Sequence, residues 1–148
     1  MKISGSIKVM HGNRIYIRNL NEGDASGKIL VLQKSLSFWG GVNPETGFII
    51  DRHHPQCGQS IKETLLLMPG IKGSTAGPGA LLECLYANNG PAAIILLQPE
   101  VSCIIAANVY LSISGKKLPI IEIEEKDAIN LHTGEQWMLT KGELVMCG

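Results

Sequence analysis

The sequence predicts one α/β domain with a parallel core, and two observations support this. From residue 64 to residue 123, short continuous apolar runs alternate with segments that have apolar residues at helical spacing. Such alternation is typical of βαβ units with parallel strands and right-handed crossovers. The chain also has 148 residues, 45% hydrophobic and 18% charged, which suffices for one buried core. We therefore expect residues 1–148 to form a single domain.

The first third of the chain reads as short strands and turns. Strands are expected over 3–9 and 14–18, around a turn at residues 11–13, and a stronger apolar strand over 28–33. Residues 37–51 mix aromatic residues with Gly-Gly and an Asn-Pro turn signal. This segment is too rich in glycine for a helix, so a structured loop followed by a short strand fits it best.

The parallel core is expected to consist of three strands and two helices. In chain order, these are a strand over 64–69, a helix over about 77–89, a strand over 92–97, a helix over about 101–114 and a strand over 118–123. The dipeptides Gly90-Pro91 and Ser114-Gly115 carry helix stop signals. A β-rich N-terminal half should pack onto this core. Loops at the carboxyl ends of parallel strands usually bind ligands, and residues 72–79 form such a loop.

The C-terminal part of the sequence has weaker signals. Two weak strands are expected near 136–139 and 143–146. Before them stands an acidic patch, which is interpreted as a solvated edge rather than a cation site. Its members are Glu122, Glu124, Glu125 and Asp127.

Charge and hydropathy argue against several classes of protein. Thirteen Lys and Arg residues balance thirteen Asp and Glu residues, so there is no electrostatic case for binding nucleic acid or an anionic membrane. The apolar runs are far shorter than the roughly 20 residues that a membrane span needs. The N-terminus also lacks the apolar centre of a signal peptide. The expected location is the cytoplasm.

The four cysteines show no metal or redox motif, because none forms a Cys-x-x-Cys pair. Cys84 and Cys103 are expected to be small core residues on helices, and no disulfide is expected in a reducing compartment. Cys57 follows His53 and His54, which raises the possibility of a metal site. Two adjacent histidines rarely serve one metal without further ligands, so we expect no metal to be held by this chain.

The most unusual local chemistry lies at Lys72-Gly73-Ser74-Thr75, between the first core strand and the first core helix. Neither the phosphate-binding loop pattern nor the Gly-x-Ser-x-Gly nucleophile elbow matches it. A hydroxyl at such a junction faces free amides and the positive end of a helix. That environment suits an anion, or a serine that must carry negative charge. The alternative is that Ser74 or Thr75 caps the next helix, and both interpretations stay open at this point.

Several segments, taken together and in order, resemble a known family. They are Phe38–Gly47, Ile50–Pro55, Gly58–Ser60, Lys72–Gly77 and Pro91–Leu96. In this order they resemble the small subunit of aconitase X, which is the swivel domain in a branch of the aconitase superfamily. The resemblance covers residues 28–123. It implies an aconitase-type swivelling β/β/α barrel-like domain around the parallel β-α-β-α-β core.

The resemblance also implies an activity that this chain would perform only with a partner. In the family, a large subunit or a fused large domain holds an iron–sulfur cluster, and the swivel part contributes a catalytic serine that maps to Ser74. The implied role is removal of a proton from the carbon next to an acidifying group, while iron binds the departing hydroxyl. Lys72, Gly73, Thr75, Arg52 and His54 are the expected substrate-binding residues. A heterodimer with the large subunit is the expected active form.

Two family reactions are candidates, namely the dehydration of cis-3-hydroxy-L-proline and of mevalonate 5-phosphate. The segments Phe38–Gly41 and Arg52–Pro55 look closer to the hydroxyproline type. The expected substrate is therefore cis-3-hydroxy-L-proline or a similar small hydroxy acid. A separate small chain, in contrast, is common in the phosphomevalonate type. Pro78 and Gln98 depart from the family pattern. They leave open a non-catalytic binding module that keeps the swivel fold.

Overall fold

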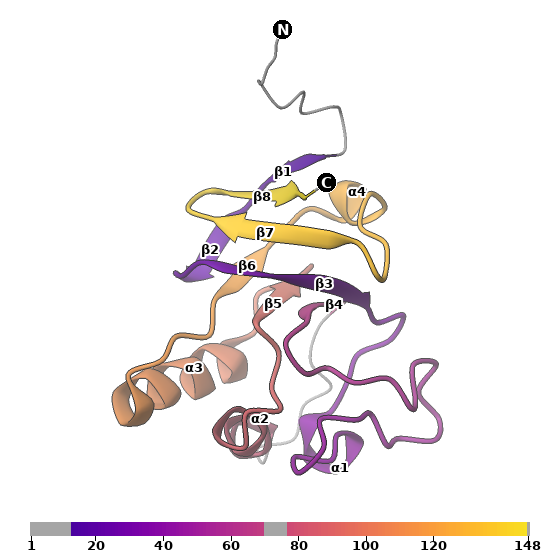
Figure 1. Cartoon of the computed structure of the whole chain (residues 1–148), viewed down its shortest axis with the longest axis vertical. Coiled ribbons are helices and arrows are strands. Elements are labelled where there is room, and N and C mark those ends of the chain that lie inside the picture. The colour runs from indigo at the N-terminus through magenta and orange to yellow at the C-terminus, as the bar shows by residue number, and fades with distance from the viewer. Residues whose placement is uncertain (1–12, 70–76, 148) are drawn as a thin grey trace, which may run out of the picture.

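The computed structural model describes residues 13–69 and 77–147 (Figure 1). Within them, the strands are β1 (Arg14–Tyr16), β2 (Arg18–Asn21), β3 (Ala25–Val31), β4 (Leu65–Met68), β5 (Ala93–Leu96), β6 (Ile120–Glu122), β7 (Gln136–Thr140) and β8 (Glu143–Met146). The helices are α1 (Phe38–Gly41), α2 (Gly77–Tyr86), α3 (Val101–Ser114) and α4 (Glu125–Ala128). None of the described helices is long and apolar enough to cross a bilayer.

The sheet closes on itself through the first two strands. Its order is β1-β8-β7-β3-β4-β5-β6-β2, so β1 and β2 stand at its two ends. Only Ile17 separates these strands in the sequence, and each pairs antiparallel with its neighbour, β1 with β8 and β2 with β6. One nearly continuous segment therefore joins both edges and completes a barrel. Closure satisfies the backbone groups that an open sheet leaves unpaired at its edges.

The parallel half of the barrel is β3-β4-β5-β6, and helices α1, α2 and α3 lie together on its outer side (Figure 1). Both faces of β4 and β5 are buried, which explains why the sequences of these two strands are continuous apolar runs. Alternate residues of β4 and β5 belong to different hydrophobic clusters. Leu65 and Ile95 belong to the inner cluster with Trp137, whereas Leu66 and Ile94 pack with the helices.

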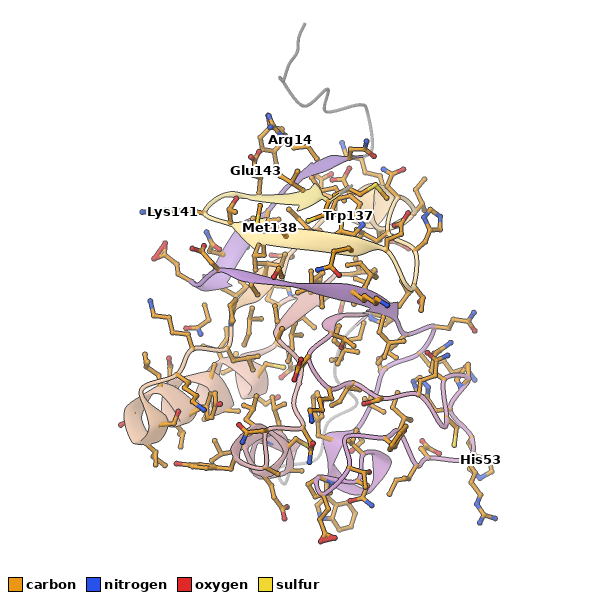
Figure 2. The ribbon with its side chains drawn as sticks, in the orientation of Figure 1. Arg14, His53, Trp137, Met138, Lys141 and Glu143 are labelled. Atoms are coloured by element: carbon orange, nitrogen blue, oxygen red, sulfur yellow. The ribbon has the colours of Figure 1, made fainter. Side chains whose placement is uncertain are left out.

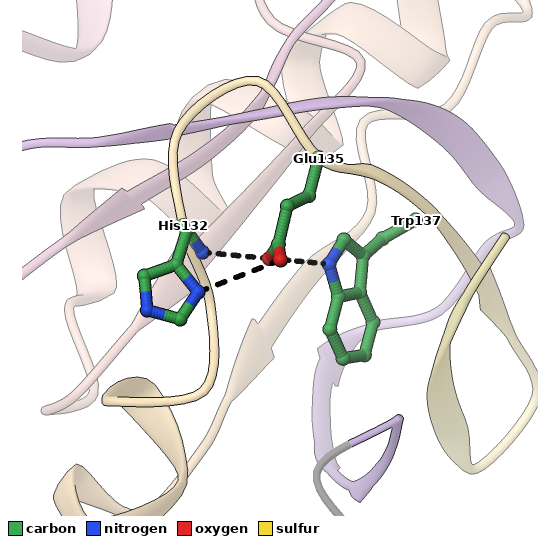
Figure 3. Close-up of polar contacts among 3 residues, drawn as sticks. All are labelled: His132, Glu135 and Trp137. Atoms are coloured by element: carbon green, nitrogen blue, oxygen red, sulfur yellow. Dashed lines mark hydrogen bonds and ion pairs between the residues drawn. The ribbon is translucent and has the colours of Figure 1, made fainter. Parts of the chain in front are cut away.

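The buried Trp137 is tied to the turn that precedes β7 (Figure 3). Its Nε1 donates to Glu135 Oε1 at 3.2 Å, and the backbone N–H of His132 donates to the same oxygen at 2.8 Å. Burial alone would raise the pKa of Glu135. The hydrogen bonds from His132 and Trp137 outweigh burial, so the pKa of this carboxyl lies below its ordinary value.

The structure confirms the predicted parallel core. The predicted helix over 101–114 matches α3, whose start is capped by Glu100 and whose end is the left-handed Gly115. Residues 37–51 are irregular, as predicted, but they begin with the short, kinked helix α1, which was not expected. The short strand expected after the loop is present only as isolated bridges, Val42 with Ile49 and Phe48 with Ser60. The strand predicted over 3–9 lies outside the described residues.

Three expectations about the fold need correction. The β-rich part that packs on the parallel core is not N-terminal alone, because the two weak strands expected near 136–139 and 143–146 are confirmed as β7 and β8 and belong to it. Strand β3 begins at Ala25 rather than near residue 28, since residues 25–28 pair with β7. Helix α2 ends at Tyr86, and Asn88 in the following turn has a positive φ of 61°. Neither β2 nor α4 was expected from the sequence.

The Glu135→Gln substitution is expected to change stability in a pH-dependent way. Because folding lowers the pKa of Glu135, its contribution is present above the pKa of the unfolded carboxyl and is lost as pH falls through the folded value. Near neutral pH the variant should be less stable by up to about 1 kcal/mol, since the carboxyl is partly exposed. Urea unfolding across the acid range measures this. Glu45→Gln is the control with the same change of charge, and parallel curves for both variants would contradict the expectation.

Candidate active-site edge

The candidate site lies at the carboxyl ends of the parallel strands. The registers of β3, β4, β5 and β6 place these ends along one edge of the barrel. The chain leaves β4 at Met68 and re-enters the described part at Gly77, where α2 begins. The expected strand-to-helix junction is confirmed for these flanks.

The core of the predicted motif falls between the two flanks. Lys72, Gly73, Ser74 and Thr75 lie outside the described residues. Their roles stay predictions.

A second segment, residues 51–58, is fixed to the same edge by two buried polar side chains. His54 is only 6% exposed, and its Nε2 donates to the backbone oxygen of Lys34 at 3.0 Å. Gln56 Oε1 accepts from the backbone N–H of Gln33 at 3.0 Å. Gln33 and Lys34 follow the carboxyl end of β3 directly, where Leu32 N–H donates to the Leu67 oxygen. The loop is thus held beside the carboxyl end of β3, the strand that pairs with β4.

Within this loop, His54 has both ring nitrogens in use. Its Nδ1 accepts from the backbone N–H of Gln56 at 3.0 Å, so the proton of the neutral ring is assigned to Nε2, which faces a carbonyl. A backbone amide can donate to Nδ1 only when that nitrogen is unprotonated. In this arrangement the His54 side chain holds the loop, and no ring nitrogen is left to contact a substrate.

Arg52 and His53, in contrast, are exposed on a turn that starts at Asp51. Asp51 Oδ1 accepts from His53 N–H at 2.9 Å, and the Asp51 backbone oxygen accepts from His54 N–H at 3.0 Å. Figure 2 shows His53 at the outer end of this loop, pointing away from the body of the protein. Arg52 is therefore presented on a well-fixed turn, although its expected contact with a substrate stays a prediction.

A cavity of about 540 Å³ lies on the β6 side of the same edge. The Arg18–Glu122 ion pair, with 3.3 Å between its atoms, forms part of its wall. Sequence reasoning missed this site because the two residues are 104 positions apart and only the β2–β6 pairing joins them. Glu124 and Glu125 are exposed there, as expected for a solvated acidic edge. The lining residues are Tyr16, Ile17, Arg18, Leu97, Glu122, Ile123, Glu124 and Glu125.

The described residues do not form a metal or cluster site. Over 13–69 and 77–147, no three His, Cys, Asp or Glu side chains are grouped closely enough to hold a metal ion. Burial, with a smaller contribution from Glu83, raises the pKa of Cys84 to about 11. Burial and the charge of Glu100 raise the pKa of Cys103 to about 12. Thiols of this kind stay protonated near neutral pH, whereas metal ligation needs the thiolate.

Comparison with known proteins decides the family. The family model of the aconitase X swivel domain matches residues 14–145. The chain belongs to the aconitase X swivel-domain family. The crystal structure of holo aconitase X from Thermococcus kodakaraensis superposes with a TM-score of 0.80 at 30% sequence identity. That match covers 91% of this chain and 98% of the other, so the barrel-like fold expected from the resemblance is confirmed.

Two kinds of dehydratase are among the proteins to which the chain is similar. The cis-3-hydroxy-L-proline dehydratase of Pseudomonas aeruginosa is 40% identical over 78% of this chain, which spans only 20% of that protein. The phosphomevalonate dehydratase small subunit of Methanothermobacter thermautotrophicus is 38% identical over 77% of this chain and 82% of that subunit. This swivel domain is thus similar to one part of a long dehydratase and to most of a small dehydratase subunit, a name that implies a larger partner.

The cysteines are expected to differ sharply in reactivity. In the folded protein a disulfide reagent at about pH 8 should modify Cys57 and Cys147, which are exposed, much faster than the buried Cys84 and Cys103. The absorbance of the thiolate that the reagent releases gives the rates, and mass spectrometry identifies the modified cysteines. In denaturant all four should react. Equal rates for the four thiols in the native protein would contradict the burial of α2 and α3 against each other.

Proposed function

We propose that this chain is the swivel part of an aconitase X dehydratase, with Ser74 as the base that takes a proton from the substrate. The main support is the similarity, at about 40% identity, to a protein named as a dehydratase of this class. The closed barrel supports the proposal too, because it supplies a rigid edge from which the segment between Met68 and Gly77 departs.

The proposed base needs help, because the pKa of a serine hydroxyl is intrinsically high. Helix α2 starts three residues after Ser74, and its first turn carries no acidic side chain. The partial positive charge at the start of this ten-residue helix is therefore not offset by its own side chains. Lys72 adds a full positive charge two residues away. Both would favour the serine alkoxide over the neutral hydroxyl.

In the proposed reaction, the Ser74 oxygen accepts a proton from the carbon next to the substrate carboxylate. The electron pair of that C–H bond forms a double bond to the neighbouring carbon, which loses its hydroxyl, so the net change is loss of water. The backbone of Gly73 and the side chains of Lys72 and Thr75 are proposed to contact the substrate. The iron–sulfur cluster of the family, which supplies Lewis acidity when bound, is assigned to the large part, because the described residues here do not fit one.

Arg52 is proposed to bind the anionic group of the substrate. It is exposed on the turn that His54 and Gln56 fix to the active edge, and a guanidinium pairs well with a carboxylate or a phosphate. His54 was expected to contact substrate as well. We instead assign it the task of holding the Arg52 turn, since its ring nitrogens are both hydrogen-bonded within the chain.

The proposed substrate is cis-3-hydroxy-L-proline or a similar small hydroxy acid, because the Pseudomonas enzyme and a fungal protein of the same name are 40% and 37% identical to this chain. A second candidate is mevalonate 5-phosphate. It is favoured by the length of the chain, which spans 82% of one phosphomevalonate dehydratase small subunit but only 20% of the hydroxyproline enzyme. Assays of the complex with both compounds distinguish the two.

Ser74→Ala in the complex with the large subunit is expected to lower dehydration at least about 1,000-fold, because the oxygen proposed to accept the substrate proton is lost. Binding of the large subunit should be unchanged. The measurement is the rate of water loss from each candidate substrate at saturating large subunit. Turnover close to that of the parent would exclude Ser74 as the base. A parent complex that dehydrates neither these two compounds nor other small 3-hydroxy acids would favour the non-catalytic binding module.

Arg52→Ala is expected to raise KM about tenfold or more, because an ion pair with an anionic substrate group is lost. The value of kcat should change less, since Arg52 is assigned to binding rather than to proton transfer. His53→Ala is the matched control, because His53 is exposed on the same turn. Steady-state kinetics of the complex measures both constants. Equal effects of the two substitutions would argue against a specific role of Arg52.

A further inference from the structure

Helix α3 has an outer face that is unusually apolar for a surface helix. Its fourteen residues contain no charged side chain, and it holds five of the twelve large hydrophobic side chains that are exposed in the described part of the chain. Four of them recur at every fourth position and form one stripe. This stripe consists of Val101, Ile105, Val109 and Ile113.

The stripe is separate from the face by which α3 packs on its own domain. Cys103, Ala106, Ala107 and Tyr110 make that inner face and are buried with α2 and the parallel strands. On the outer face, Val101, Ile105 and Ile113 are 67%, 51% and 62% exposed. With a rise of about 1.5 Å per residue, the stripe is about 18 Å long. A helix that is apolar on both faces is normally covered on both.

The position of the stripe relates it to the proposed active site. Strand β5 ends at Leu96, and α3 begins at Val101, so the first turn of the helix lies at the carboxyl edge of the barrel. Strand β4, which ends at Met68, pairs with β5 and reaches the same edge. A protein that met substrate at this edge would also lie over the first turns of α3.

We propose that the α3 stripe is the surface by which this chain docks to the large part of the dehydratase. This rests on the proposed function. Two observations favour this occupant over others. The chain corresponds to 20% of the hydroxyproline dehydratase and to 82% of a phosphomevalonate dehydratase small subunit. In the first kind of relative this fold is joined to a longer chain, and in the second its name implies a larger subunit. The stripe also begins at the edge where that polypeptide must complete the site.

The chemistry of the stripe defines the surface that it fits. Because the outer face of α3 offers only aliphatic and small polar side chains, the matching surface on the large subunit must be aliphatic and poor in Lys and Glu at its centre. Depletion of charge is typical of the centre of protein–protein interfaces. A charge placed within the stripe would be desolvated on docking, at a cost that only an opposite charge could offset.

The test measures docking, not catalysis. Ile105→Glu keeps a good helix former at an exposed position, and Ile129→Glu makes the same change after α4, where the side chain is 74% exposed. We expect Ile105→Glu to raise the dissociation constant for the large subunit of the same organism more than tenfold. Ile129→Glu should change it less than twofold. Titration calorimetry measures binding, and circular dichroism checks that both variants fold.

Each remaining outcome has a defined meaning. If Ile105→Glu and Ile113→Glu both bind like the parent, the stripe is not the docking surface. If light scattering shows that the lone parent chain is a dimer that Ile105→Glu dissociates, the stripe binds a second copy and the proposal is wrong. Ser74→Ala keeps α3 intact, so it should lose dehydration but bind the large subunit normally. The two variants therefore distinguish a failure of docking from a failure of catalysis. A parent chain that does not bind the large subunit would overturn the proposed function and the docking surface together.

Discussion

Closure of the barrel by one short segment is the constraint on which the rest of the structure depends. Because Ile17 alone separates β1 from β2, the same stretch of chain must satisfy β8 on one side and β6 on the other. This fixes where the antiparallel half meets the parallel half. It also encloses the inner hydrophobic cluster, in which Trp137 is fully buried. The three helices then need to cover only the outer face of the parallel strands.

This arrangement separates stability from function in space. The inner cluster and the cluster under the helices supply the burial that holds the fold, and neither includes Arg52. The cavity beside β6 touches the inner cluster only at its wall, through Ile123. The loop over residues 51–58 at this edge is instead held by its own hydrogen bonds. His54 and Gln56 are buried polar residues, and their hydrogen bonds run to the backbone after β3. A loop anchored in this way can present a charged side chain without support from the core.

Much of the parallel half could be predicted from the sequence, because its signals are local. Continuous apolar runs mark β4 and β5, and the Glu100 cap and Gly115 bound α3. Strand β2 could not be predicted, since its polar sequence makes sense only beside β6, about a hundred residues away. The Ser74 segment was singled out by its local motif and a family resemblance, and its role stays a prediction. The role of His54 in anchoring its loop was missed because its hydrogen-bond partner is a backbone carbonyl, which the sequence of side chains does not reveal.

The pairing of β1 with β8 has a consequence for how this domain can be combined with others. Met146 N–H donates to the Asn13 backbone oxygen at 2.9 Å, so the chain enters and leaves the barrel at neighbouring points. Figure 1 places the C-terminal end of the described chain on the side of the barrel away from α1, α2 and α3. Further polypeptide could be attached where Asn13 and Met146 lie side by side, or cut off there, without disturbing the helices. The same fold is therefore compatible with a separate small subunit and with a domain inside a longer chain, the two forms found among the relatives.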